Sequence, residues 1–252
     1  FWDVAVVALG ADLCAVEEAH DFLRDVPDKQ PFMGTSCCPS WSVMAKQEFP
    51  EVAHCISMAL TPMVLTARLQ KKRHPEHKIV FIGPCSAKKL EASRKSVKSY
   101  VDFVLTFEEL MGMFDAKGID LAAAEPESAG NDATAAGRGF AVSGGVAKAV
   151  VDAIARLAPG REVKVQCAQG LRECKEMVRA AAAGKYDGYL LEGMACPGGC
   201  VAGTGTLQDA RKSAALIARY QNETETKNAM DSKYGDDLEL LKQFKHEESA
   251  DS

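Results

Sequence analysis

The sequence has no long apolar run and little net charge. No uninterrupted apolar stretch approaches the roughly 18 residues that a membrane-spanning helix needs, and no signal peptide is visible, although the first residue is not Met. The formal net charge is -5, and residues 222–252, with nine acids and four bases, account for it. We therefore expect neither a membrane anchor nor an extended basic surface for nucleic acid.

The nine cysteines lack the regular spacing of a secreted disulfide framework. Their number is odd, and many lie beside Pro, Gly or Lys, which favours a reduced cytoplasmic compartment and a metal or redox role. The C-x2-C-x2-C-x3-C-P run of bacterial ferredoxins is also absent, so we expect no accessory cluster of that type in this chain.

Apolar runs alternate with amphipathic stretches, which predicts an α/β fold with parallel sheets. We expect Pro62 to kink a helix, and Thr106 to cap another helix together with Glu109. Residues 122–139 read as a mobile loop or a surface insertion. The expected strands are residues 2–9, 78–82, 101–105, 163–167 and 186–191, and the expected helices are residues 17–24, 41–49, 54–72, 106–116, 144–157, 170–183 and 207–221.

The chain divides by composition into a main domain, residues 1–221, and an acidic tail, residues 222–252. Two lobes, of about residues 1–100 and 101–221, would fit within the main domain. The tail is expected to add a helix that carries Leu238, Leu241 and Phe244.

Three segments place cysteines in loops that Pro or Gly constrains. Residues 35–41 read TSCCPSW, residues 84–91 read PCSAKKLE, and residues 192–200 read EGMACPGGC. Each follows a predicted strand or precedes a predicted helix, which places it at a sheet edge. Soft thiolates suit either zinc or an iron–sulfur cluster, so ligand type alone leaves both open.

Local geometry indicates four ligands and one spare thiol. Cys196 and Cys200 can bind one metal centre because the two glycines between them let the backbone fold tightly. Cys37 and Cys38 are adjacent, so their side chains diverge and only one is expected to be a ligand, while Cys85 follows a proline at a strand end. The remaining thiols read as small buried apolar side chains: Cys14, Cys55, Cys167 and Cys174.

Taken together, the three segments resemble the signature motifs of the H-cluster domain of the FeFe-hydrogenases, in the family's order and over roughly residues 4–210. The resemblance implies two lobes of parallel sheet flanked by helices, with the metal cluster in the cleft between them. It also implies a 4Fe-4S cluster bound by Cys38, Cys85, Cys196 and Cys200. Cys200 would bridge to a di-iron subcluster with CO, cyanide and a bridging dithiolate.

The same resemblance implies roles for the other motif residues. Cys37 would pass protons to and from the bridgehead amine of the dithiolate, and Lys88 would hydrogen-bond a cyanide ligand, whereas Lys89 reads as an exposed charge. Glu91 joins the catalytic set, although a salt-bridged loop carboxylate is an equal alternative. The residues expected around the cofactor are Pro62, Pro84, Ser86 and Met194.

A proton path to solvent is also implied by the resemblance. Glu18 and Ser57 match its inner members, and Asp21 replaces the outer Glu with a side chain one methylene shorter, so that a water would be needed to close the gap. Glu18 alone would read as a solvated helix carboxylate.

The sequence departs from the family's pattern at two motif positions. Gly83 stands where well-known catalytic members have Met, which leaves room beside the di-iron site, and residues 201–206 lack the common Gly-Gln-Pro ending. The opening residues resemble the middle of a lobe. These features indicate a divergent branch and a truncated chain.

Three functions follow from the resemblance. The first is reversible proton reduction to H2, with ferredoxin or a redox subunit as electron partner and maturation proteins that install the di-iron subcluster, in an anaerobic cytoplasm. The second is a hydrogen-sensing homologue with slow turnover. The third is an iron–sulfur assembly protein without the di-iron site, against which Cys37, Lys88 and Glu91 argue.

Overall fold

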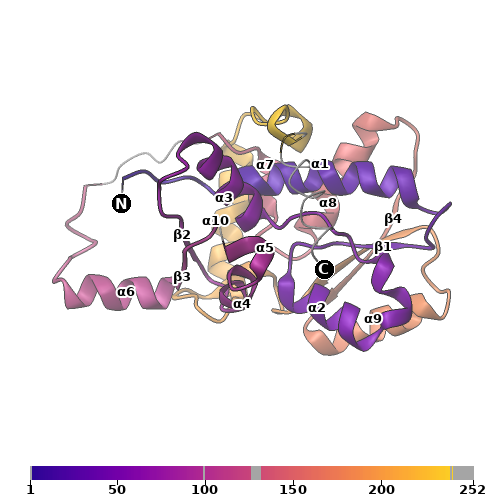
Figure 1. Cartoon of the computed structure of the whole chain (residues 1–252), viewed down its shortest axis with the longest axis horizontal. Helices are drawn as coiled ribbons and strands as arrows, with labels where there is room; N and C mark the ends of the chain where they lie inside the picture. The colour runs from indigo at the N-terminus through magenta and orange to yellow at the C-terminus, as the bar shows by residue number, and fades with distance from the viewer. Residues whose placement is uncertain (1, 99, 126–131, 239, 241–252) are drawn as a thin grey trace.

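The computed structural model describes residues 2–98, 100–125, 132–238 and 240, and shows two parallel sheets covered by helices (Figure 1). The larger sheet has the order β1-β5-β4, and the smaller sheet pairs β2 with β3. This confirms the predicted α/β class with parallel sheets flanked by helices. The strands are β1 (Met33–Gly34), β2 (Val80–Gly83), β3 (Phe103–Thr106), β4 (Lys164–Gln169) and β5 (Tyr189–Met194).

The larger sheet lies between two helical layers. Successive side chains of a strand point to opposite faces. Leu190 therefore packs in one apolar core with α1 and α8, and Leu191 packs in the other with α2 and α9. The covering helices are α1 (Ala8–Asp25), α2 (Pro39–Glu48), α8 (Gly145–Leu157) and α9 (Leu171–Ala182).

The smaller sheet is covered by α3 (Pro62–Arg73), whose Met63, Val64 and Ala67 form a third core with the strand side chains Phe81 and Val104. α6 (Phe107–Ala116) projects from this sheet at the left of Figure 1. It begins at the predicted capping box, in which Thr106 and Glu109 cap each other. The short helices α4 (Ala87–Ala92) and α5 (Lys95–Lys98) connect β2 to β3.

α1 joins the two sheets because it contacts both α3 and α8. The crossing with α3 is close: a Cβ at Gly10 would lie 2.2 Å from the Pro62 carbonyl oxygen, so only glycine fits there. The C-terminal segment also belongs to the main core, since Ala229 and Leu238 are buried in it. The remaining elements are η1 (Pro50–Cys55), α7 (Ala135–Gly139), η2 (Cys200–Ala202), α10 (Ala210–Glu223) and η3 (Ala229–Asp231).

Three sequence predictions are wrong. Residues 122–139 are not a loop or surface insertion throughout, because Ala135–Gly139 form the buried helix α7. Residues 2–7 form no strand. They lead into α1 without regular secondary structure, and only Ala8 and Leu9 of the apolar run lie in that helix, because so short a run has no periodicity that identifies a strand. Pro62 does not kink a helix over residues 54–72. It occupies the first turn of α3, where its missing N–H removes no hydrogen bond, after η1 and an extended segment.

The sheets do not divide at residue 100. β1 pairs with β5, and β2 pairs with β3, so each sheet combines strands from both sides of that residue. Of the three residues expected in a tail helix, Leu238 packs in the core, while Leu241 and Phe244 lie outside the described residues.

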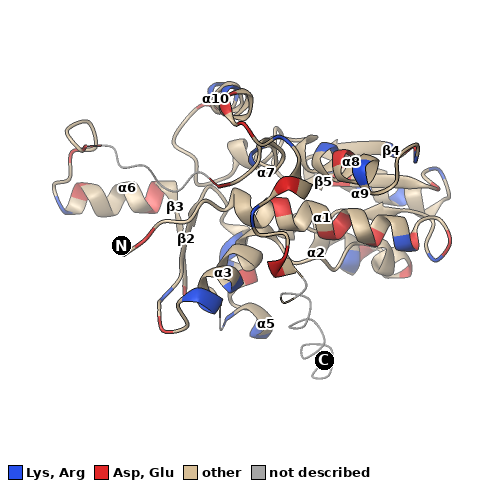
Figure 2. Ribbon diagram, turned by 90° about the horizontal axis from the view of Figure 1, so that it is seen from above, with Lys and Arg blue, Asp and Glu red and all other residues tan. Residues whose placement is uncertain are grey.

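Charged residues are spread over the helices and loops of the described chain, with acidic and basic positions interspersed (Figure 2). Of the helices that the structure describes, none combines the length and the apolar composition required to cross a bilayer.

Asp12 of α1 caps α7 from within the core, and its loss is expected to destabilise the fold. Its carboxylate accepts hydrogen bonds from the Thr134 N–H (2.8 Å), the Thr134 hydroxyl (2.5 Å) and the Gly137 N–H (2.9 Å). Asp12→Ala leaves these buried donors unpaired, so the free energy of unfolding should fall by about 3 kcal/mol in urea titrations followed by circular dichroism.

The control is Lys148→Ala, which removes an exposed ion pair with Asp152 and should cost less than about 0.5 kcal/mol. A loss in Asp12→Ala no larger than that of the control would contradict the capping role.

Candidate functional site

Each cysteine loop leaves the carboxyl end of a parallel strand. The first follows β1, the second follows β2 and the third follows β5. The first and third loops start side by side because β1 and β5 are hydrogen-bonded neighbours. The carboxyl edge of a parallel sheet is the usual place for a binding site in α/β proteins.

The first loop is fastened to β5 by its own motif residues. The Thr35 N–H donates to the Leu191 carbonyl (2.9 Å), and the Trp41 indole N–H donates back to the Thr35 carbonyl (2.9 Å). The Trp41 ring lies against Gly193, where a Cβ would come within 2.1 Å of it. Cys38 then occupies the N-cap position of α2.

The third loop folds tightly, as its glycines predict. Gly198 and Gly199 have φ values of 99° and 93°, in the left-handed region that favours glycine. The Gly198 carbonyl accepts a hydrogen bond from the Ser143 N–H (3.1 Å), and a Cβ at Gly199 would lie 2.6 Å from the same nitrogen.

The segment after Cys200 joins the third loop to the second. The Gly205 N–H donates to the Pro84 carbonyl (2.9 Å), and the Thr204 hydroxyl donates to the Ser86 hydroxyl (2.8 Å). This segment lacks the family's usual ending, yet it holds the two loops together through its backbone.

The three loops surround a cavity of about 860 Å³. Pro62, Pro84 and Met194 line it, as expected, whereas Ser86 is exposed and contacts Thr204 instead. Apolar side chains of α6 and α10 complete the wall. The thiols and the ammonium group that face the cavity belong to Cys37, Cys38, Cys85, Cys200 and Lys88.

Cys196 lies beside this cavity rather than in its lining, but it belongs to the same group of thiols. Burial, followed by the nearby Cys38 and Cys85, raises its pKa. Cys200 is open to the cavity and surrounded by protein on its other sides; burial, with Cys38 and Cys85 again contributing, raises its pKa to about 12. Both thiols are therefore protonated at neutral pH without a metal, and metal binding must release their protons.

The spacing of the thiols fits a cluster better than a single zinc ion. Four sulfurs that bind one zinc tetrahedrally at about 2.3 Å lie about 3.8 Å apart. Among the described residues, no three cysteine sulfurs lie within 4.8 Å of one another. Three of the four predicted ligand thiols line the cavity and Cys196 lies beside it, a spread that suits a 4Fe-4S cluster because the cluster is wider than one ion.

Lys88 is held at the cavity by a buried ion pair. Its ammonium donates to Glu91 (2.7 Å), and the other oxygen of Glu91 accepts from the Thr61 hydroxyl (2.8 Å). Burial opposes the charge, but Glu91 and the thiols of Cys85 and Cys37 raise the Lys88 pKa above its usual value. The ammonium is therefore charged and oriented.

Lys89 points outward and pairs with Glu109, as expected of an exposed charge. Thr61 was not identified from the sequence, and the only signal was its position before a proline that begins a helix.

Glu18 is a buried carboxyl group next to the first loop. Its Oε1 accepts the Ser36 N–H (2.6 Å), and its Oε2 is buried with no hydrogen-bond partner in the described part of the chain. Burial raises its pKa to about 8, so it carries a proton at neutral pH. Burial, followed by the Glu18 charge, also raises the Cys37 pKa, which places these two groups in the same electrostatic environment.

The other two members of the predicted proton path, the outer Asp21 and the inner Ser57, lie in different surroundings. Asp21 follows Glu18 by one helical turn and forms an ion pair with Arg24 (2.8 Å) near the surface. Ser57 is buried, and its hydroxyl accepts the Ala59 N–H (3.1 Å) in its own loop. Glu18 and Asp21 thus lie one turn apart on α1, Cys37 lies in the loop after β1, and Ser57 makes its hydrogen bond within its own loop.

The space expected beside Gly83 is largely filled by Phe81. A Cβ at Gly83 would lie 2.7 Å from the Phe81 ring, and both residues line the cavity. An aromatic ring two residues upstream thus occupies room that a larger side chain at position 83 would take.

The model of the family described as iron only hydrogenase large subunit, C-terminal domain, matches residues 1–204. The chain belongs to this family. Its three cysteine loops, in their order and in their placement at one cavity, are consistent with that membership.

Two curated hydrogenases are similar in sequence to this chain. The periplasmic Fe hydrogenase large subunit of Nitratidesulfovibrio vulgaris is 29% identical over 248 residues, which cover 81% of this chain and 58% of that protein. Iron hydrogenase 1 of Clostridium pasteurianum is 28% identical over 79% of this chain and 42% of that protein. This chain therefore spans only about half the length of the hydrogenases it matches.

A shorter similarity extends to a different class of protein. The cytosolic Fe-S cluster assembly factor NAR1 of Kluyveromyces lactis is 33% identical over 107 residues, which cover 42% of this chain. Family membership alone therefore does not separate a hydrogenase from an assembly factor.

Solved structures share the fold. One FeFe-hydrogenase, described in connection with oxygen inactivation, superposes with a TM-score of 0.75 at 22% identity over 94% of this chain and 80% of that chain. HydA1 from Chlamydomonas reinhardtii gives a TM-score of 0.74 at 21% identity over the same share of this chain and 79% of its own. At this identity the likeness establishes the fold alone.

The raised pKa of Glu18 predicts a specific pH dependence of stability. The folded state keeps a proton on Glu18 up to about pH 8, whereas the unfolded state releases it near pH 4.5. Protonated Glu18 contributes fully to stability below pH 4.5. As the pH rises from there to about 8, this contribution is lost and the free energy of unfolding falls by about 1.4 kcal/mol per pH unit. Glu18→Gln should flatten the curve over that window in urea titrations of the metal-free protein.

Glu48→Gln is the matched control, because it removes an exposed carboxylate that pairs with Lys175. It should keep the wild-type slope. Identical slopes for the wild type and Glu18→Gln would show that Glu18 is ionised in the folded state.

Proposed function

We propose that this chain is the catalytic domain of an FeFe-hydrogenase that reversibly reduces protons to H2. A 4Fe-4S cluster would be bound by Cys38, Cys85, Cys196 and Cys200, and the cavity would hold a di-iron subcluster with CO, cyanide and a bridging dithiolate. The observation that carries the proposal is the pairing of a thiol, Cys37, with a fixed ammonium, Lys88, in the same cavity as three of the four ligand thiols.

When bound, the di-iron subcluster supplies the redox chemistry that combines two protons and two electrons into H2. The protein holds a positive charge beside it. Because Glu91 and Thr61 fix the Lys88 ammonium at 8% exposure, its hydrogen bond to an anionic ligand would form without further ordering or competition from water.

Protons would reach the cavity through side chains with raised pKa values. The Cys37 thiol keeps its proton at neutral pH, and Glu18 also carries a proton that it can exchange. Asp21, paired with Arg24 near the surface, is placed to exchange protons with solvent. Water would connect these groups where no direct hydrogen bond exists.

Electrons would enter at the cysteine loops. Cys196 is partly exposed, so the ligand thiols lie close to the surface rather than at the centre of the core. Ferredoxin or a redox subunit is our proposed donor, and maturation proteins would install the di-iron subcluster. The nine free thiols of the chain suit a reducing, oxygen-free cytoplasm.

An assembly factor without the di-iron site is the second candidate, favoured by the similarity to NAR1. The buried Lys88–Glu91 pair argues for the hydrogenase, because a buried ion pair is costly to maintain unless it serves the cavity it faces. A hydrogen sensor would share all these residues and differ in its slow turnover.

The test is hydrogen evolution from reduced viologen by anaerobically reconstituted protein supplied with a synthetic di-iron cofactor. The wild type should evolve H2 only when the cofactor is added. Cys37→Ala should lower the rate by at least about 100-fold at equal iron content, because it removes the group that relays protons.

Cys55→Ala is the control, since this thiol is buried in the core away from the cavity. It should keep the wild-type rate. Full turnover in Cys37→Ala would overturn the relay, and no turnover in cubane-loaded wild type would favour the assembly role.

A further inference from the structure

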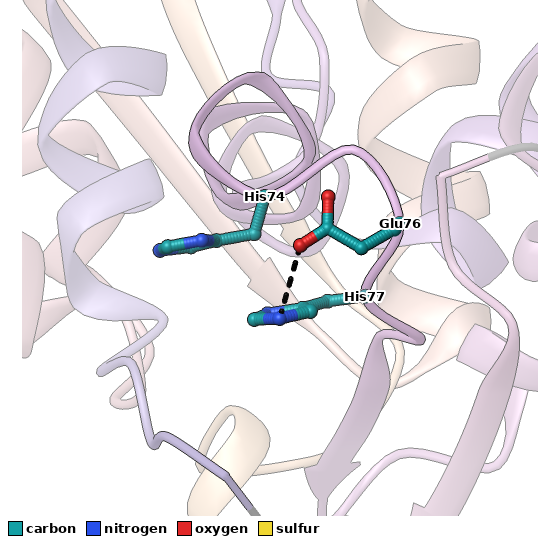
Figure 3. Close-up of side chains that lie close together, drawn as sticks. All are labelled: His74, Glu76 and His77. Carbon is teal, nitrogen blue, oxygen red and sulfur yellow. Dashed lines mark ion pairs between the residues drawn. The ribbon is translucent and has the colours of Figure 1, made fainter.

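The turn between α3 and β2 brings together two imidazoles and a carboxylate that the H-cluster site does not use. We propose that His74, Glu76 and His77 bind a divalent transition-metal ion (Figure 3). One ligand atom from each residue lies within 4.8 Å of the other two. Among the described residues, no other three His, Cys, Asp or Glu side chains bring their ligand atoms this close together.

The backbone of the turn fixes the two histidines. His74 ends α3, where its N–H donates to the Gln70 carbonyl (2.8 Å). The His77 N–H donates to the His74 carbonyl (3.1 Å), which closes a four-residue turn with Pro75 at its second position. The Lys71 ammonium donates to the His77 carbonyl (2.6 Å) and anchors the end of the turn.

The side chains converge on one side of this turn. The two imidazole rings lie 4.6 Å apart with an angle of 12° between their planes, and Glu76 Oε1 lies 3.2 Å from His77 Nε2 (Figure 3). The Trp2 indole packs edge-on against both rings, at 5.1 Å from His74 and 4.5 Å from His77. The three ligand atoms are therefore already close together, and binding of one ion requires the stacked rings to turn so that both nitrogen lone pairs point at it.

The donor set selects the class of ion. Two imidazoles and one carboxylate suit Zn²⁺, Ni²⁺ or Co²⁺ rather than Mg²⁺ or Ca²⁺, which prefer oxygen ligands alone. Three protein ligands also leave coordination positions for water. A separate cavity of about 360 Å³, lined by both histidines and Trp2, adjoins the group and gives solvent access to it.

The surrounding positive charge is offset in part by other contacts. The last turn of α3 is basic, as the blue end of that helix in Figure 2 shows. Lys71 and Lys78 pair with Asp102 (3.6 and 2.9 Å), and Lys72 pairs with Asp237 (2.9 Å). These acids offset the cations that would otherwise repel an incoming ion.

The experiment titrates Ni²⁺ into cluster-loaded protein, whose cluster ligands are then occupied, by isothermal calorimetry under anaerobic conditions. One Ni²⁺ should bind per chain, and His74→Ala and His77→Ala should each weaken binding at least tenfold. His54→Ala removes a histidine outside the turn and should bind as the wild type does. Equal cluster absorbance in all four proteins shows that they are folded.

Trp2 provides a second readout that locates the ion. Ni²⁺ should quench Trp2 fluorescence at the same midpoint as the calorimetric binding, and Trp2→Phe should abolish this quenching while calorimetric binding remains. Binding that survives both histidine substitutions, or that His54→Ala weakens equally, would overturn the site. Neither result depends on hydrogenase activity.

Discussion

The hydrogen bond between the Gly205 N–H and the Pro84 carbonyl joins two loops that belong to different sheets, and the cavity depends on that connection. The first and third cysteine loops are already neighbours through β1 and β5. The second loop comes from the smaller sheet, and within the described residues that sheet shares no strand pairing with the larger one. The chain after Cys200 closes this gap, and α1 supports it from the far side by contacting helices of both sheets.

The site buries titratable groups, and burial disfavours the charged form of each of them. Buried thiols and a buried carboxyl group stay protonated because ionisation without water is costly. Lys88 keeps its charge chiefly because Glu91 lies 2.7 Å away. The result is a cavity lined by the protonated thiol of Cys37 and the fixed positive charge of Lys88, with the protonated carboxyl group of Glu18 next to the first loop.

Much of this site was predictable because its motifs are local. The cysteine segments, their placement after strands and the tight turn at Gly198 and Gly199 follow from short stretches of sequence. Contacts made across the fold were not predictable: Thr61 meets Glu91 across 30 residues, and Asp12 caps a helix 122 residues away. Strand pairing was equally hidden, since a two-residue strand such as β1 carries no period, and the apolar run before α1 fits either a strand or a buried helix.

The central claim is that four cysteines from both sheets bind one four-iron cluster. The most direct measurement is iron and sulfide analysis with electron paramagnetic resonance on anaerobically reconstituted protein. We expect about four iron and four sulfide per chain and the signal of a reduced 4Fe-4S cluster, lost in Cys85→Ser and kept in Cys174→Ser. About one metal ion per chain, or equal loss of the cluster in both variants, would contradict the account.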